Sequence, residues 1–265
     1  MFFPDAHNHL QDPRLAESRE EIIAAAKKSG VARMVVNGTG EADWPEVAAL
    51  ARAHPGLVIP AFGLHPWRVN ERGENWLATL RDFLREFPSA PVGEIGLDRW
   101  LPGHDLPAQE KVFRDQISLA QELRRPLVIH CLKAFGLLEK CLRDHFPLPR
   151  NFLLHSYGGS LEQTKIFAAL GGWFSCSAYF FLPRKAAQQA VFQHIPLERL
   201  LVETDAPDMR GPEELSPHPL ADREGNPLNH PANLPAIYTA AARLRGMEPT
   251  AFSAAIAANF QNFFR

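Results

Sequence analysis

Four histidines stand at the ends of short apolar runs in this 265-residue chain, where their side chains could bind metal ions. His7 and His9 close the first run, and a spacing of two places both side chains on one face of an extended segment. His130 and His155 each come directly after a later apolar run. Imidazole is a good ligand for zinc and other transition metals. A lone histidine could equally be a core residue with its hydrogen bonds satisfied, but matching positions after different runs indicate ligands.

Carboxylates occupy comparable positions in two other runs. Glu94 lies inside an apolar run, where it would be costly to bury or would take up a proton unless a cation faces it. That cation could be a metal ion or an arginine. Asp205 and Glu203 share one face at the end of the run 200–202. Asp205 lies nearer the end and is the better ligand or base, whereas Glu203 would orient a ligand histidine from a deeper layer or form a structural ion pair.

Together these side chains outnumber the three or four protein ligands of a single catalytic zinc. The six candidates are His7, His9, Glu94, His130, His155 and Asp205. Two divalent ions about 3.5–4 Å apart, bridged by a carboxylate, would use all of them. Glu94 is the natural bridge because it lies between the two histidine pairs in chain order. The ions would activate a water molecule, and Asp205 would orient that water and accept its proton. The ions could be Mg²⁺, Mn²⁺ or Zn²⁺.

Aromatic residues and one further histidine lie near the predicted site. His65 closes the third apolar run and could contact an anionic group of the substrate, or could simply be a turn residue. Trp67 and Trp100 fall in the same predicted layer of loops. They could stack on nucleic-acid bases, but packing between loops is the interpretation that we prefer.

The elements that must position these side chains alternate between strands and helices. Helical spacing separates the apolar runs, and alternation of this kind indicates a parallel sheet with right-handed crossovers. Eight such units in this length predict an α/β fold with a single (β/α)₈ TIM-type barrel, whose sites lie at the C-terminal ends of the strands. A doubly wound open sheet is the alternative, although no GxGxxG motif follows the first run. The predicted strands are 2–4, 34–36, 58–62, 92–95, 127–129, 152–154, 173–174 and 200–202. The clearest predicted helices are 18–28, 43–53, 107–123, 235–244 and 249–260.

Composition narrows the class of protein. Hydrophobic residues make up 46% and charged residues 22%, so a mainly disordered chain is excluded. A net charge of −2 argues against a protein that coats duplex DNA without sequence preference. Three cysteines without CxxC spacing, no signal peptide and no long apolar run predict a cytoplasmic protein that is not in a membrane. The segment 205–235 is predicted to be a long loop, no linker divides residues 1–265, and we expect one domain and a monomer without an obligate protein partner.

At these residues the chain resembles the TatD family of metal-dependent deoxyribonucleases, within the amidohydrolase-like superfamily. The motifs that carry the resemblance are His7-Asn8-His9, Gly63-Leu64-His65-Pro66-Trp67, Gly93-Glu94-Ile95-Gly96-Leu97-Asp98, Pro126-Leu127-Val128-Ile129-His130, His155-Ser156-Tyr157-Gly158-Gly159 and Leu201-Val202-Glu203-Thr204-Asp205-Ala206-Pro207. They follow the family order over nearly the whole chain. The resemblance implies a (β/α)₈ fold, a divalent-metal site and cleavage of DNA phosphodiester bonds, with a 3'-5' exonuclease as one form of that activity. It also implies ligand roles for the same six residues.

Two positions depart from the family pattern. Members often carry Arg-Asn-Glu-Pro where this chain has Leu228-Asn229-His230-Pro231, and Arg99-Trp100 replaces a phenol-rich continuation. Both positions fall where substrate would lie. An amide or lactone hydrolase of the amidohydrolase type is therefore the alternative enzyme, although such enzymes often bridge their metals with a carboxylated lysine where this chain has Glu94. A metal-binding protein without catalytic activity is the third hypothesis, which the open mouth of a barrel argues against.

Overall fold

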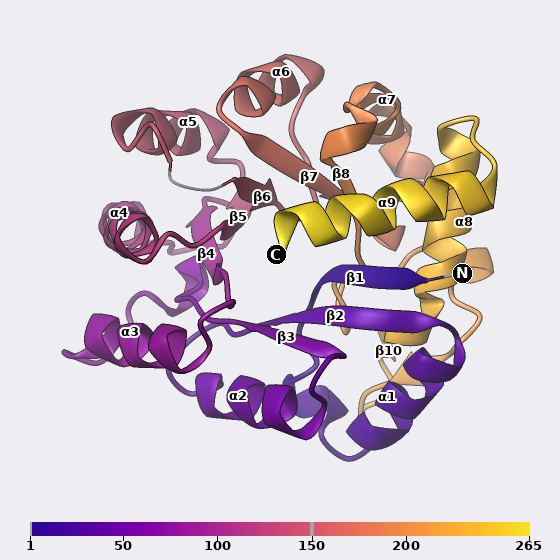
Figure 1. Cartoon of the computed structure of the whole chain (residues 1–265), viewed down its shortest axis with the longest axis horizontal. Coiled ribbons are helices and arrows are strands. Elements are labelled where there is room, and N and C mark those ends of the chain that lie inside the picture. Colours follow the sequence, from indigo (N-terminus) through magenta and orange to yellow (C-terminus); the bar gives the residue numbers. More distant parts are fainter. Residues whose placement is uncertain (1, 149–150) are drawn as a thin grey trace.

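The computed structural model describes residues 2–148 and 151–265, and it contains the predicted alternation of strands and helices (Figure 1). All eight predicted strands are present, and the eight lie parallel in chain order. They are β1 (Phe3–Asn8), β2 (Val31–Asn37), β3 (Val58–Ala61), β4 (Val92–Asp98), β5 (Leu127–Leu132), β6 (Phe152–Leu154), β7 (Gly172–Cys176) and β8 (Leu200–Val202).

The strands pair as two sheets that join at both edges. One sheet has the order β1-β2-β3 and the other has the order β4-β5-β6-β7-β8. A parallel bridge between Phe62 and Val92 links β3 to β4. At the other edge, the residues that follow β8 bond to β1, because the N–H of Asp205 donates to the carbonyl oxygen of His7 at 2.9 Å. The ring is therefore a (β/α)₈ barrel, and the open-sheet alternative is wrong.

Helices surround this ring, as Figure 1 shows. They are α1 (Arg19–Lys28), α2 (Trp44–Ala53), α3 (Trp76–Glu86), α4 (Leu106–Leu123), α5 (Phe135–Asp144), α6 (Leu161–Ala169), α7 (Ala186–His194), α8 (Leu234–Leu244) and α9 (Pro249–Phe263). Their termini follow local chemistry. The side chain of Asp105 caps α4 by accepting from the N–H of Ala108 at 3.0 Å, and Ser160 with Gln163 forms a capping box at α6.

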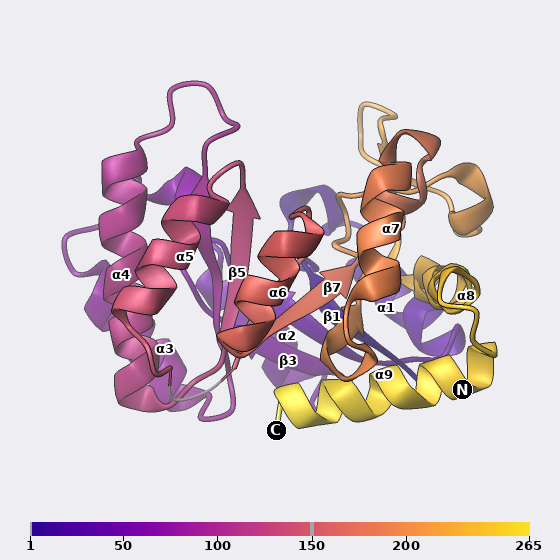
Figure 2. The same cartoon turned by 90° about the horizontal axis from the view of Figure 1, so that it is seen from above.

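The last helix closes the N-terminal end of the barrel. Figure 2 shows α9 along the edge that carries both termini, with the loops after the strands at the opposite edge. Phe260, Phe263 and Phe264 of this region pack with inward-facing strand residues such as Val128 and Trp173. The rings of Trp173 and Phe263 are 5.6 Å apart. Apolar side chains thus fill the N-terminal half of the barrel interior, and polar side chains occupy the C-terminal half.

Close approach between neighbouring strands explains one glycine of the fourth strand. A Cβ atom on Gly96 would lie 1.9 Å from the carbonyl oxygen of His130, and Gly96 has a φ of +151°. Only glycine fits this position without moving β5. The site residues Glu94 and His130 on these strands are therefore held in a fixed register, with Gly96 opposite His130.

The segment after β8 is largely a long loop, as predicted, but it also contains short elements. It contains a short antiparallel pair, β9 (Leu220–Ala221) with β10 (Pro227–Leu228), and α8 begins at Leu234. Within the described part of the chain, no helix combines the length and apolarity needed to cross a membrane.

Candidate metal centre

The six predicted ligands meet at the C-terminal mouth of the barrel. Their positions are in or just after β1, β4, β5, β6 and β8. A cavity of about 640 Å³ opens above them, and its lining includes His9, Glu94, His130, His155 and Asp205. His7 is fully buried beneath this lining. The predicted convergence on one mouth is therefore present in the structure, while the ligand role of each residue stays a prediction.

One group of donor atoms surrounds the end of β1 and is called here the β1 group. It consists of His7 Nε2, His9 Nε2, Glu94 Oε2 and Asp205 Oδ1. The two imidazole nitrogens are 3.2 Å apart, and they lie 3.3 and 3.2 Å from Glu94 Oε2 and 3.6 Å each from Asp205 Oδ1. A tetrahedral ion with ligands at 2.0–2.2 Å holds its donor atoms about 3.4 Å apart. The separations among His7 Nε2, His9 Nε2 and Glu94 Oε2 match that spacing, so these three atoms could hold one cation, and Asp205 Oδ1 lies 3.6 Å from both imidazole nitrogens.

A second group of donor atoms faces the other oxygen of the same carboxylate and is called here the β5 group. It consists of His130 Nδ1, His155 Nε2 and Glu94 Oε1. Glu94 Oε1 lies 3.2 Å from the His130 nitrogen and 2.8 Å from the His155 nitrogen. Glu94 thus presents one oxygen to each group, which is the geometry that a bridging carboxylate requires. The arginine alternative for Glu94 has no support here, because its ion-pair partners in the structure are histidines.

Hydrogen bonds to the far ring nitrogens set which nitrogen each histidine offers. His9 Nδ1 lies 2.9 Å from the carbonyl oxygen of Asn37, so Nδ1 carries the proton and Nε2 is free to bind a cation. His130 Nε2 lies 2.9 Å from Asp98 Oδ2, so Nε2 carries the proton and Nδ1 is free. Both free nitrogens point at Glu94, which is where the ligand hypothesis needs them.

The far ring nitrogen of His65 faces a hydrogen-bond donor, whereas those of His9 and His130 face acceptors. Its Nδ1 accepts from the backbone N–H of Trp67 at 3.2 Å, so the neutral ring carries its proton on Nε2. That Nε2 lies 3.3 Å from Glu94 Oε1. Although His65 sits beside the β5 group, this tautomer favours a hydrogen-bond donor over a metal ligand. The predicted contact with an anionic group fits that chemistry.

Burial and charge shift the pKa values within the cluster. Burial alone would raise the pKa of Glu94, but the facing imidazoles of His155, His65 and His7 hold it well below its usual range. Burial alone would lower the pKa of His9, but the hydrogen bond and charge of Glu94 raise it to about 9. Burial lowers the pKa of His7 to about 3. Near neutral pH the carboxylate is thus balanced by protonated histidines, and cation binding must release those protons.

Asp205 combines an unusual backbone with a shifted pKa. Its φ is +54°, in the left-handed region that non-glycine residues rarely adopt, and such strain is concentrated at functional sites. Burial raises the pKa of its carboxyl group to about 6, near the range in which a general base works best. Its Oδ2 accepts from Ser156 Oγ at 3.3 Å, while Oδ1 faces the β1 group. The Asp205 carboxylate therefore directs Oδ1 at the β1 group and Oδ2 at Ser156.

Glu203 lies fully buried behind the cluster, in the deeper layer that the sequence predicts. Its Oε1 accepts from the backbone N–H and the hydroxyl of Ser156, each at 2.7 Å, and lies 3.7 Å from His155 Nδ1. Burial alone would raise the pKa of Glu203, but contact with His155 lowers it. The carboxylate thus fixes Ser156, the residue after His155, while it faces the His155 ring at a distance too long for a hydrogen bond.

Sequence reasoning assigned no role to Asp98, which the structure makes central. Asp98 is fully buried, bonds to His130, and accepts from the indole N–H of Trp67 at 2.8 Å and the backbone N–H of Trp100 at 2.6 Å. The signal was present, because Asp98 shares a strand face with Glu94 four residues earlier. Trp67 is 48% exposed and Trp100 is 55% exposed, so packing between loops covers only part of each indole. They line the cavity and are not buried between loops.

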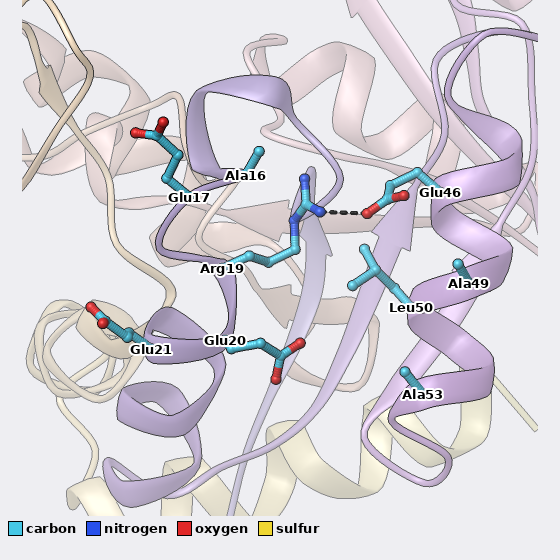
Figure 3. Close-up of a pocket in the computed structure, with 9 residues that line it drawn as sticks. All are labelled: Ala16, Glu17, Arg19, Glu20, Glu21, Glu46, Ala49, Leu50 and Ala53. Carbon is cyan, nitrogen blue, oxygen red and sulfur yellow. Dashed lines mark hydrogen bonds and ion pairs between the residues drawn. The ribbon is translucent and has the colours of Figure 1, made fainter.

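A second hollow of about 390 Å³ lies outside the barrel, between α1 and α2 (Figure 3). Its lining includes the exposed carboxylates of Glu17, Glu20 and Glu21, and an ion pair between Arg19 and Glu46. Exposed carboxylates of this kind are solvated without an ion. The groups that could hold a metal, in the part of the chain that the structure describes, all include residues of the barrel mouth.

Comparison with known proteins finds similarity over nearly the whole chain. The family model described as "TatD related DNase" matches residues 4–265. The "3'-5' ssDNA/RNA exonuclease TatD" of Erwinia tasmaniensis is 29% identical over 257 residues, with 97% of each chain covered. The "Uncharacterized metal-dependent hydrolase YjjV" of Escherichia coli is 30% identical over 245 residues, which cover 92% of this chain and 90% of that protein. The crystal structure of YjjV superposes with a TM-score of 0.88 at 29% identity, covering 99% of this chain and 97% of that one.

Proposed function

This chain belongs to the TatD-related DNase family, and we propose that this metal-dependent hydrolase cleaves phosphodiester bonds of single-stranded DNA from the 3' end. The observation that carries the proposal is the division of one buried carboxylate, Glu94, between the β1 group and the β5 group. Relatives that align over 97% of this chain are named as 3'-5' exonucleases of single-stranded DNA and RNA. A DNA or RNA strand, or another phosphodiester, is therefore the proposed partner.

We propose two divalent ions, one at each group. His7, His9 and Asp205 would hold the first, His130 and His155 the second, and Glu94 would bridge them. Four imidazoles among the six proposed ligands favour Zn²⁺ over Mg²⁺ and Mn²⁺, which prefer oxygen ligands. When bound, such ions would supply Lewis-acid chemistry, which lowers the pKa of a bound water and stabilises charge on the phosphoryl group.

Side chains of the protein would accept a proton, contact the phosphate and hold the proposed ligands in position. Asp205 would take the proton of the attacking water, because one of its oxygens faces the β1 group and burial raises its pKa to about 6. His65 would donate its Nε2–H to a phosphate oxygen once Glu94 is engaged by cations. Glu203 and Asp98 would keep His155 and His130 in position.

Domain organisation, oligomeric state and localisation complete the proposal. We propose that residues 1–265 form a single domain that acts as a monomer in the cytoplasm without an obligate protein partner. Cys131, Cys141 and Cys176 are free thiols, as expected in a reducing compartment. Burial raises the pKa of Cys141 to about 11 and those of the other two still further, so none of them is a reactive thiolate.

A substrate panel tests the proposed function. Purified protein reconstituted with Zn²⁺, Mn²⁺ or Mg²⁺ is incubated with single- and double-stranded DNA and with RNA, each labelled at one end, and in parallel with lactone and amide substrates. We expect metal-dependent release of nucleotides from the 3' end of the single strand, abolished by a chelator. Hydrolysis of lactones or amides with no cleavage of any nucleic acid would favour the amidohydrolase alternative. No hydrolysis of any substrate by the metal-loaded protein would favour the non-catalytic one.

A further inference from the structure

Two half-exposed tryptophans form part of the wall of the cavity above the candidate metal centre. Trp67 follows β3 and is 48% exposed, and Trp100 follows β4 and is 55% exposed. Leu132, at the end of β5, is 36% exposed and lines the same cavity. Large apolar side chains are costly to leave in water, so a concentration of them inside a cavity indicates a ligand surface.

A single buried carboxylate positions both tryptophans. Asp98 Oδ2 accepts from the indole N–H of Trp67 at 2.8 Å, and Oδ1 accepts from the backbone N–H of Trp100 at 2.6 Å. The indole of Trp67 is therefore held in one orientation while one side of it stays open. A ring that is already fixed loses little conformational entropy when it binds a flat ligand.

The fixed indole lies beside the residues that surround Glu94. Its centroid is 5.0 Å from the ring of His65 and 6.3 Å from the ring of His130. Asp98 also bonds to His130, at 2.9 Å, so one side chain holds both the aromatic wall and a proposed ligand. A nucleotide whose phosphate reaches the metal centre would bring its base to this wall.

We propose that Trp67 and Trp100 form a base-stacking platform for the nucleotides that flank the scissile phosphodiester. The proposal rests on the proposed function, since it names how that site holds its substrate. Every base has an aromatic face, so such a platform tolerates any sequence. At the end of a duplex only the outer face of the last base pair is free, so a platform that stacks on more than one base favours an unpaired strand.

The test combines variants of the protein with a variant of the substrate. The substrates are a single-stranded oligodeoxynucleotide and the same strand with abasic nucleotides on both sides of its 3'-terminal phosphodiester. Stacking of one base corresponds to about 5- to 150-fold in affinity. We expect Trp67→Ala to lower kcat/KM by about that factor on the normal strand and to have little effect on the abasic strand. Phe2→Ala, at an exposed aromatic on the opposite end of the barrel, is the matched control and should change neither.

Further variants separate stacking from the support of Asp98. Trp67→Phe keeps an aromatic face and loses the N–H, so it should retain most of the activity on the normal strand. Trp100→Ala removes a side chain whose backbone, and not its ring, bonds to Asp98. Like Trp67→Ala, the Trp100→Ala variant should show a smaller difference in kcat/KM between the normal strand and the abasic strand than the parent does. Metal content is measured for each variant, and activity is compared per metal-loaded chain.

Failure of the nuclease function and failure of the platform give different results. If the parent protein cleaves neither strand, the proposed nuclease function fails and the platform fails with it. If the parent cleaves the normal strand but Trp67→Ala and Trp100→Ala slow both strands by equal factors, or slow neither, the platform is wrong while the nuclease function stands. A Trp67→Phe variant as slow as Trp67→Ala would assign the effect of Trp67 to its bond with Asp98.

Discussion

The donor geometry predicts that the two proposed ions can be removed separately. His130 Nδ1 and His155 Nε2 face only one oxygen of Glu94, Oε1, at 3.2 and 2.8 Å. The His130→Ala/His155→Ala double variant would leave the β1 group intact, with His7, His9, Asp205 and Glu94 Oε2 in place. We therefore expect this variant to hold one ion per chain where the parent holds two.

The size of the effect on stability follows from mass action. An ion present at 100 times its dissociation constant stabilises the folded state by about 2.7 kcal/mol, so two ions contribute about 5.4 kcal/mol. For a chain of this size, 1 kcal/mol raises Tm by roughly 2–4 °C. Saturating metal should thus raise the Tm of the parent by about 11–22 °C and that of the double variant by about half as much.

The assay measures metal and stability on the same samples. Elemental analysis after dialysis gives ions per chain, and thermal unfolding with and without chelator gives the metal-dependent rise in Tm. His104→Ala/His194→Ala is the matched control, since it removes two exposed histidines that lie away from the cluster. A His130→Ala/His155→Ala variant that keeps both ions, or loses both while folded, would refute the division of Glu94 between two groups.

Three further predictions concern single residues. Glu94→Gln should reduce metal content towards zero, because both groups lose their shared charge, and elemental analysis checks it. Asp205→Asn should slow single-turnover DNA cleavage by about 10²–10⁴-fold with DNA affinity largely kept, since it removes a positioned acid–base group; cleavage near the parent rate would contradict that role. Burial lowers the pKa of His230 to about 4, so the unfolded chain binds that proton more tightly and stability falls as pH falls from about 6.5 to 4. Between pH 7 and pH 5, the unfolding free energy of His230→Gln should therefore fall by about 2 kcal/mol less than that of the parent. Urea unfolding of both proteins at the two pH values measures this difference.

Much of the architecture is encoded in local patterns of the sequence. Each predicted strand is a short apolar run, which is typical of a strand buried on both faces of a parallel sheet. The predicted helix 249–260 and its observed counterpart α9 (Pro249–Phe263) begin at the same proline. The candidate ligands could be named for the same reason, because polar side chains that end parallel strands must emerge at one mouth of a barrel.

The tertiary structure alone decides which atoms of the site contact one another. Glu94 and His155 are 61 residues apart, and only the packed barrel sets which oxygen of Glu94 faces which imidazole. The tautomers of His9 and His130 depend on Asn37 and Asp98, which lie on neighbouring strands. No spacing in the sequence specifies these contacts, since they arise from side-chain rotamers that burial selects.

The two tryptophans show the same division between sequence and structure. The sequence determined that Trp67 and Trp100 follow the third and fourth strands, and hence that they belong to the loops around the mouth. It did not determine their exposure, because an indole between loops and an indole on a cavity wall have the same local sequence. The bond from Trp67 to Asp98, 31 residues away, holds the ring at the open cavity, and such a bond exists only once β3 and β4 lie side by side in the folded chain.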